Sequence, residues 1–190
     1  MFEQELREAI NQVTEQYIAI HDEVERIWAQ YMVFTWHWWI DLALSVLPWL
    51  LWIRVRDKRH THRLLYAGMF TAFIATVVDL MGVSQGRWNY DTWLLPFLPE
   101  YLPWDWTVMP VTAMLFYQFF PKINPFLKGA FFGGFASYVV EPVFLTLGFY
   151  EQTGWKHYYS LPVYIVIYMI GYWLYTRRFS PLESKDSFSR

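Results

Sequence analysis

Four ionisable side chains lie inside stretches of the chain that are otherwise almost wholly apolar. They are His37 and Asp41, which are one helical turn apart, and the carboxylates Asp79 and Glu141. An ionisable group inside a membrane costs free energy, so such groups mark ligand sites, proton paths or buried hydrogen-bond networks. These four residues are therefore the first candidates for a functional site.

The stretches that hold these residues have the length of membrane spans. The hydrocarbon core of a bilayer is about 30 Å thick and takes a helix of about 20 apolar residues. Tryptophan and tyrosine gather at the ends of the apolar stretches, as they do at the headgroup level of membranes. We therefore predict an all-α integral membrane bundle of five transmembrane helices. The predicted helices cover residues 31–53, 64–83, 103–120, 125–147 and 160–176.

The basic residues fall mainly on one side of this predicted bundle. Most of the 15 Lys and Arg residues lie in the loop after the first span, in the turn before the fourth and in the C-terminal tail. Cytoplasmic loops carry an excess of Lys and Arg, so the N-terminus is predicted outside and the C-terminus in the cytoplasm. The chain then divides into an extracytoplasmic amphipathic helix (1–30), the transmembrane domain (31–177) and a disordered cytoplasmic tail (178–190).

This orientation brings the acidic residues to one depth in the membrane. Asp41 lies in the outer half of the first span, Asp79 near the outer end of the second, and Glu141 in the outer half of the fourth. Asp105 begins the third span from the same side. We therefore predict an outward-facing polar cavity lined by carboxylates, with His37 beside them. The alternative is that each carboxylate is structural and accepts hydrogen bonds from Trp or Tyr side chains.

The outer loop of residues 84–102 is rich in aromatic residues and proline, and it follows Asp79 closely. Trp88 and Tyr90 within this loop complete the candidate site. The loop either covers the cavity as a lid or anchors the chain at the membrane surface. Small residues precede Asp79 at helical spacing, and Gly129 and Gly133 form a second small-residue motif, which allows close helix packing. The face of Asp79 is therefore predicted to point into the bundle.

The segment before the first span carries a separate signal. Apolar residues recur there at alternating spacings of four and three from Leu6 to Tyr31. This spacing is typical of a coiled-coil seam or of a helix that lies on an apolar surface. The stripe continues in register into the first span, so we predict one continuous helix from near Glu3 to near Pro48. Its outer part, residues 6–31, either pairs with a second copy of the chain, which we favour, or folds back onto the outer loops.

Composition argues against several classes of function. The net charge of −2 lacks the basic excess that nucleic-acid binding requires. The chain contains no Cys, which excludes disulfides, thiolate metal sites and a thiol nucleophile. We predict no metal ion and no cofactor. The expected partners are membrane lipid, a ligand of unknown identity and a second copy of the chain.

Several short motifs resemble those of a known family. They are Trp36-His37-Trp38-Trp39, Asp79-x-x-Gly82 with Gly86-x-Trp88-x-Tyr90, Trp104-Asp105 with Pro110, Glu141-Pro142, and Gly148-x-Tyr150 followed by Trp155 and Tyr158-Tyr159-Ser160. In order and spacing they resemble a family of small, Trp-rich multi-pass proteins of unknown function from endospore-forming bacteria. The resemblance covers roughly residues 30–175 and implies a bacterial plasma-membrane location. It implies no activity.

Two stretches also resemble the lycopene cyclase domain of carotenoid synthesis. Gly86-Arg87-Trp88-Asn89-Tyr90 fits the pattern of that domain. Pro103-Trp104-Asp105-Trp106 departs from it, because it offers one Asp where the domain carries Glu. This resemblance implies an isoprenoid or carotenoid cyclase that uses a carboxylic acid.

Three functions remain open from the sequence. We expect the protein to bind or sense a small amphiphilic ligand in the carboxylate-lined cavity. The first alternative is a cyclase-like membrane enzyme, in which a carboxylic acid donates its proton to a carbon–carbon double bond and aromatic walls stabilise the resulting cation. The second is a proton- or cation-coupled transporter that relays its ion through Asp41, Asp79 and Glu141.

Overall fold

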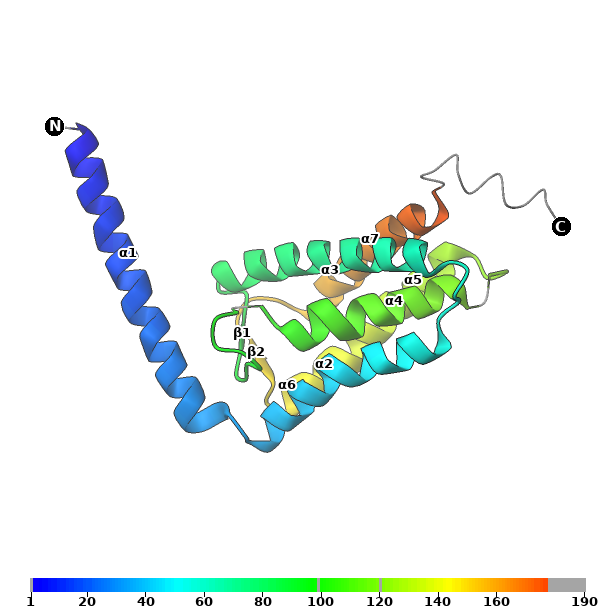
Figure 1. Cartoon of the computed structure of the whole chain (residues 1–190), viewed down its shortest axis with the longest axis horizontal. Coiled ribbons are helices and arrows are strands. Elements are labelled where there is room, and N and C mark those ends of the chain that lie inside the picture. Colours follow the sequence, from blue (N-terminus) through cyan, green and yellow to red (C-terminus); the bar gives the residue numbers. More distant parts are fainter. Residues whose placement is uncertain (1, 99, 120, 178–190) are drawn as a thin grey trace.

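The computed structural model describes residues 2–98, 100–119 and 121–177, which are mostly helical (Figure 1). The α-helices are α1 (Phe2–Ile27), α2 (Trp36–Val55), α3 (Thr61–Ser84), α4 (Met109–Gln118), α5 (Pro125–Phe135), α6 (Glu141–Thr146) and α7 (His157–Thr176). Three π-helical segments extend them, namely η1 (Trp28–Met32), η2 (Pro103–Val108) and η3 (Ala136–Val140). The strands are β1 (Trp88–Tyr90) and β2 (Tyr150–Gln152). The predicted tail of residues 178–190 lies outside the described residues.

Residues 2–55 form two separate helices, α1 and α2, so the prediction of one continuous helix from Glu3 to Pro48 is wrong. The chain turns sharply before α2, where Phe34 has a positive φ of 63°. Thr35 then caps α2, because its Oγ1 accepts a hydrogen bond from the backbone N–H of Trp38 (3.4 Å). The apolar stripe continues across the turn, but this local capping decides where the helix begins.

α1 projects away from the rest of the helices (Figure 1). None of residues 2–27 is buried, and Leu6, Ile10 and Val13 of the apolar stripe are exposed. The helix therefore does not fold back onto the outer loops here. Contact with those loops begins only at η1, where the indole N–H of Trp28 donates to the Trp93 carbonyl (2.9 Å). Pairing of α1 with a second copy of the chain stays a prediction.

Proline lies inside α2 without ending it. A proline has no N–H for the carbonyl four residues before it, so Pro48 leaves the carbonyl of Leu44 without its helical partner. Thr107 of η2 fills this gap, because its Oγ1 donates to the Leu44 carbonyl (2.9 Å). The result is a helix that continues through Pro48 and is fastened to η2 at that point.

A second hydrogen bond at a proline runs in the other direction, from α2 to the segment that contains Pro110. This proline leaves the carbonyl of Trp106 without its helical partner. The indole N–H of Trp49 in α2 donates to that carbonyl (3.1 Å). Each of the two segments therefore donates a hydrogen bond to the carbonyl that the proline of the other leaves unpaired. These two bonds hold α2 in fixed register against η2 and α4.

Small residues make the close helix contacts that the sequence predicted. On α3 the buried positions include Gly68, Ala72, Ala75 and Asp79. On α5, Gly129 packs against α7, since a Cβ added there would lie 2.8 Å from the ring of Tyr168. Gly133 does the same one turn later, where a Cβ would lie 3.1 Å from the backbone carbonyl of Leu161. The Asp79 face of α3 thus points into the bundle.

Within the described residues, three helical segments are long and apolar enough to cross a membrane. They are Trp36–Val55, Thr61–Ser84 and Pro125–Thr146. Large apolar side chains on these segments point outward and are exposed, among them Leu50, Leu51, Phe70, Phe73, Phe131 and Phe135. Extensive exposed apolar surface marks contact with a membrane or a partner. The prediction of a mostly helical protein with membrane-like helices is thereby confirmed, whereas α7 and the η2–α4 segment are not among these three candidates.

The small sheet was not predicted from the sequence. β1 and β2 pair antiparallel, with Tyr90 opposite Tyr150. Each strand follows a glycine of positive φ, Gly86 (65°) and Gly148 (74°), a conformation that residues with a side chain rarely adopt. The sheet lies at one end of the helix bundle and joins the loop of residues 84–102 to the segment before α7 (Figure 1).

Candidate functional site

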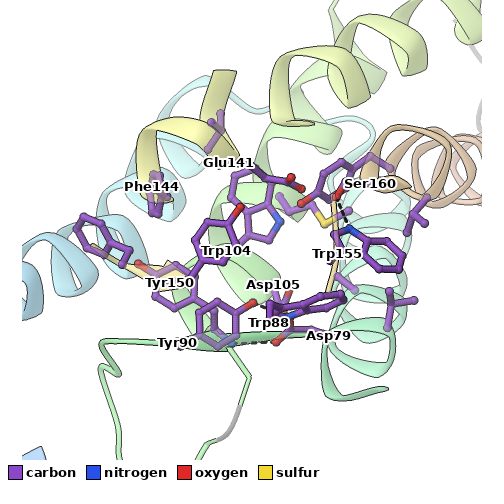
Figure 2. Close-up of a pocket in the computed structure, with 18 of the residues that line it drawn as sticks. Asp79, Trp88, Tyr90, Trp104, Asp105, Glu141, Phe144, Tyr150, Trp155 and Ser160 are labelled. Carbon is purple, nitrogen blue, oxygen red and sulfur yellow. Dashed lines mark hydrogen bonds between the residues drawn. The ribbon is translucent and has the colours of Figure 1, made fainter. Parts of the chain in front are cut away.

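A cavity of about 110 Å³ lies at the end of the bundle that carries the sheet (Figure 2). Its walls come from the C-terminal half of α3, from both strands, from η2, from the junction of η3 and α6, and from the start of α7. Of the seven predicted site residues, Asp79, Trp88, Tyr90, Asp105 and Glu141 line the cavity. His37 and Asp41 are not among its lining residues.

Asp79 accepts hydrogen bonds from three directions. The Trp88 indole N–H (2.8 Å) and the Tyr90 hydroxyl (2.5 Å) both donate to its Oδ1. The backbone N–H of Tyr101 donates to its Oδ2 (3.2 Å). The interpretation of a carboxylate held by Trp and Tyr donors therefore fits Asp79, which anchors β1 and the loop after it to α3.

The glycines around Asp79 make this anchor possible. Gly82, one turn after Asp79, lies directly under the ring of Trp88, and a Cβ there would be 1.9 Å from that ring. Gly86 then turns the chain back at a positive φ, so that Trp88 and Tyr90 reach the carboxylate. The motif that runs from Asp79 through Gly82 and Gly86 to Tyr90 is thus one structural unit.

Asp105 is bound differently from Asp79. Its side chain is only 3% exposed, lines the cavity, and carries an Oδ2 with no hydrogen-bond partner among the described residues. The carboxyl of Asp105 interacts with the carboxyl of Asp79. Two carboxylates cannot bond to each other, because neither has a donor, so a bond between them requires a proton on one. Asp105 is therefore a buried acid whose oxygen is available to a proton or a ligand.

Glu141 lies across the cavity from the two aspartates, at the start of α6 (Figure 2). His157 Nδ1 lies 2.9 Å from its Oε2. The hydroxyls of Ser160 and Tyr164 also interact with this carboxylate. Glu141 therefore joins α6 to the first two turns of α7 and closes the wall opposite Asp79.

Asp41 and His37 belong to a neighbouring network rather than to the cavity. Asp41 is fully buried and accepts hydrogen bonds from the hydroxyls of Tyr101 and Thr92 (3.0 Å for Thr92). His37 Nε2 donates to the carbonyl of Leu147 (3.0 Å). Tyr101 links the two networks, since its hydroxyl bonds to Asp41 while its backbone N–H bonds to Asp79.

Aromatic rings form much of the cavity wall. They are Trp88, Tyr90, Tyr101, Trp104, Phe144, Phe149, Tyr150, Trp155 and Tyr164. Several of their polar atoms are already engaged; for example, the Trp155 indole N–H donates to Ser160 Oγ (2.8 Å). Burial, and then the nearby charge of Asp79, raise the pKa of Tyr90 well above its ordinary value. Tyr90 therefore remains a neutral phenol that donates to Asp79.

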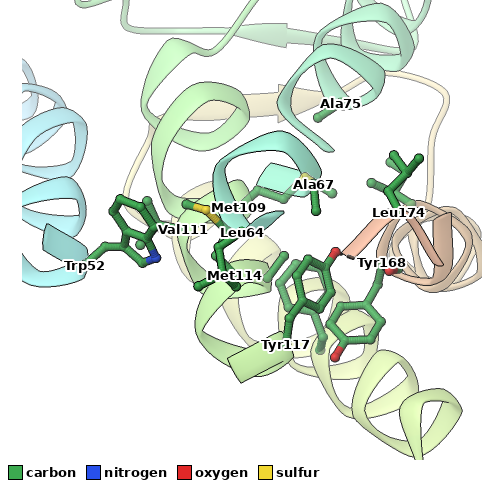
Figure 3. Close-up of a cluster of buried hydrophobic side chains, with 13 residues drawn as sticks. Trp52, Leu64, Ala67, Ala75, Met109, Val111, Met114, Tyr117, Tyr168 and Leu174 are labelled. Atoms are coloured by element: carbon green, nitrogen blue, oxygen red, sulfur yellow. Dashed lines mark hydrogen bonds between the residues drawn. The ribbon is translucent and has the colours of Figure 1, made fainter. Parts of the chain in front are cut away.

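The floor of the cavity is continuous with the hydrophobic core of the bundle. Ala75, Met109 and Ile167 line the cavity and also belong to the buried cluster that holds α3, α4 and α7 together (Figure 3). The cavity is therefore supported by packed side chains, not only by loops. A site built on such a scaffold keeps its shape.

Several residues of the site were missed in the sequence. Tyr101 and the buried Glu100 stand at the end of the predicted outer loop, just before the third span. Trp155 comes from the segment between β2 and α7, and Tyr164 from the second turn of α7. The motif around Trp155 and Ser160 was a signal for this wall, but the approach of β2 to β1, which brings it to Asp79, was not predicted. The described residues include no group of three or more His, Cys, Asp or Glu that could hold a metal ion.

Comparison with known proteins gives no match: no family model, no curated protein and no solved structure matches the chain. The family resemblances of the motifs therefore stay predictions. Any statement about function has to rest on the geometry of the cavity.

Proposed function

We infer that the protein is a multi-pass membrane protein that binds a small ligand in the cavity between Asp79, Asp105 and Glu141. In this proposal the η2–α4 segment and α7 complete a five-span bundle in a bacterial plasma membrane. The excess of Lys and Arg in the α2–α3 loop supports a cytoplasmic position for that loop, in which case the cavity opens towards the outside. The ligand reaches it without crossing the membrane.

The observation that carries this proposal is the unpartnered oxygen of Asp105. A buried polar atom without a partner costs about 1–3 kcal/mol, so natural proteins rarely keep one without a use. Asp41 and Asp79 show that the same chain supplies donors where a carboxylate is structural. Asp105 has the same degree of burial but lacks such a donor at Oδ2, and it lines the cavity.

A pair of neighbouring substitutions on α3 tests this proposal. Val78 lines the cavity, whereas Val77 is exposed on the outer face of the same helix. Val78→Phe should fill the cavity, while Val77→Phe adds the same ring on the outside. The full chain is purified in mild detergent, and the bound molecules are extracted and identified by mass spectrometry.

We expect one compound at near-equal amount to the protein in the wild type and in Val77→Phe, and its loss in Val78→Phe. An identical lipid mixture in all three preparations would contradict a specific ligand site. Folding of each variant is checked by its elution as a single species in gel filtration.

The isoprenoid enzyme is the second candidate, and one observation favours it. A buried carboxylic acid among aromatic rings can protonate a carbon–carbon double bond, and the rings stabilise the resulting cation. Asp105, next to Trp104 in η2, has this setting. A polyene or prenyl lipid among the extracted molecules, and its conversion by wild-type protein but not by Asp105→Asn, would support the enzyme.

A further inference from the structure

The cavity is acidic, and the described residues provide no positive side chain in its lining. Asp79, Asp105 and Glu141 line it, and no lysine, arginine or histidine does so. The buried Glu100 adds a fourth acidic group, because it interacts electrostatically with both Asp79 and Asp105. Carboxylates brought together away from water repel one another and need protons or a cation between them. The site is therefore suited to a positive ligand.

The kind of cation follows from the rest of the wall. A metal ion or another strongly hydrated cation needs several oxygen ligands at close range. Among the described residues, no group of three or more His, Cys, Asp or Glu side chains is close enough to hold a metal ion. Aromatic faces instead surround the space, from Trp88, Trp104 and Trp155 among others. Aromatic cages of this composition bind quaternary ammonium groups, whose charge is spread over methyl groups that contact the rings.

Two of the rings that line the cavity are held in fixed positions by their neighbours. Trp88 and Trp155 meet edge to face, with ring centroids 5.2 Å apart and planes at 69°. Their indole N–H groups are already bonded, to Asp79 and to Ser160. Where these two side chains line the cavity, they therefore offer a ligand the π-system of the ring and no free N–H donor. The faces and the free Oδ2 of Asp105 attract the same charge.

The size of the cavity sets a limit on the ligand. Its volume of about 110 Å³ is smaller than an engineered cavity of about 150 Å³ that accepts benzene. Only the alkylated ammonium group of a ligand fits inside this space; the rest of such a ligand, like most of a long polyene, would have to extend beyond it. We propose that the cavity binds a small alkylated ammonium ion, with its methyl groups against Trp88, Trp104 and Trp155 and its charge beside Asp105. This assignment rests on the proposed function, that the cavity is a ligand site.

Choline is the probe, and its neutral isostere is the control. The isostere carries a tert-butyl group in place of the trimethylammonium group, so it has the same shape without the charge. Binding of each is measured by isothermal titration calorimetry to the full chain in lipid nanodiscs at constant ionic strength. We expect choline to bind about thirtyfold more tightly than the isostere, which corresponds to the free energy of a desolvated cation–π contact.

Two carboxylate variants locate the charge. Asp105→Asn should lower the affinity for choline by about tenfold and leave the isostere unchanged. Asp57→Asn is the matched control, because Asp57 lies in the exposed loop between α2 and α3. It should change neither affinity. If Asp105→Asn fails to fold, the comparison of choline with its isostere in the wild type decides the question by itself.

The outcomes separate this inference from the proposed function. Equal binding of choline and its isostere, or no binding of choline at millimolar concentration, overturns the ammonium assignment. If Val78→Phe still expels a bound compound that is uncharged, such as a polyene, the cavity is a ligand site and only the ammonium assignment is wrong. If Val78→Phe has no effect on bound molecules and neither probe binds, both proposals are wrong.

Discussion

Thr107 provides a quantitative test of how the cavity wall is held in place. Thr107→Val removes the hydroxyl and keeps the shape of the side chain. The hydroxyl has one proton, and the carbonyls of Leu44 and Pro103 both accept from it at a position that is only 4% exposed. A hydrogen bond of this kind contributes about 0.5–1.5 kcal/mol, and about 0.6 kcal/mol is typical between helices in a membrane. We therefore expect a loss of about 1 kcal/mol, or about 2–4 °C in Tm for a chain of this length.

The role of Pro48 makes this prediction specific. Pro48→Ala returns a backbone N–H to the Leu44 carbonyl, so the Thr107 hydroxyl is no longer needed there. In that background Thr107→Val should cost less, and we expect a coupling free energy of about 0.5–1 kcal/mol between the two positions. Thr146→Val is the matched control, because Thr146 bonds the carbonyl four residues back on an exposed face of α6. It should change stability by less than about 0.5 kcal/mol.

The assay is thermal unfolding of the four variants of the cycle, followed by far-ultraviolet circular dichroism in one detergent. Each preparation must first show reversible unfolding, because only then does Tm report a free energy. An equal loss from Thr107→Val with and without Pro48 would refute the argument. It would mean that the hydroxyl serves Pro103 alone and does not fasten η2 to α2.

The other predictions concern the anchor of β1, the orientation and α1. Gly82→Ala should displace Trp88 from Asp79 and lower Tm by several degrees, whereas Gly134→Ala, where an added Cβ meets no atom within 4 Å, should not; equal Tm values would contradict the contact. Because the chain has no native Cys, single cysteines report orientation without background. A membrane-impermeant maleimide should label Glu8→Cys on intact cells and Lys58→Cys only after permeabilisation, and the reverse pattern would invert the topology. Deletion of residues 2–28 should reduce the mass in detergent to that of a monomer, and an unchanged oligomeric state would end the coiled-coil hypothesis.

The convergence of the acidic residues was predictable because it depends only on chain direction. Successive helices that run in opposite directions bring the end of one beside the start of the next. Asp79 near the end of its helix, Asp105 at the start of the next and Glu141 late in the fourth span must then reach similar depths, and all three line the cavity. The direction of the chain does not determine how each helix is rotated about its own axis. Asp41 has a similar depth but faces Thr92 and Tyr101 instead.

The errors have local physical causes. The regular spacing of apolar residues predicted a helix that continues through Phe34. This spacing shows which face of a helix is apolar, but a new helix can begin within it without disturbing it. Thr35, which precedes a run of aromatic residues, was a signal for a helix N-cap, but the prediction gave more weight to the apolar spacing. The sheet was missed because each of its strands has only three residues. Its remaining signal was a glycine two residues before an aromatic residue, at Gly86 and again at Gly148.

Asp79 and Asp105 show why a carboxylate in an apolar stretch does not by itself identify a site. Both are acidic, nearly buried and in contact with the cavity. Asp79 has its donors supplied by its own sequence neighbours, because Gly82 and Gly86 bring Trp88 back over it. Asp105 lies in the first turn of η2, two residues after Pro103, and no described residue supplies a donor to its Oδ2. Since a structural carboxylate is stable with its partners alone, Asp105, whose Oδ2 has no partner among the described residues, is the group whose replacement should change ligand binding more than stability.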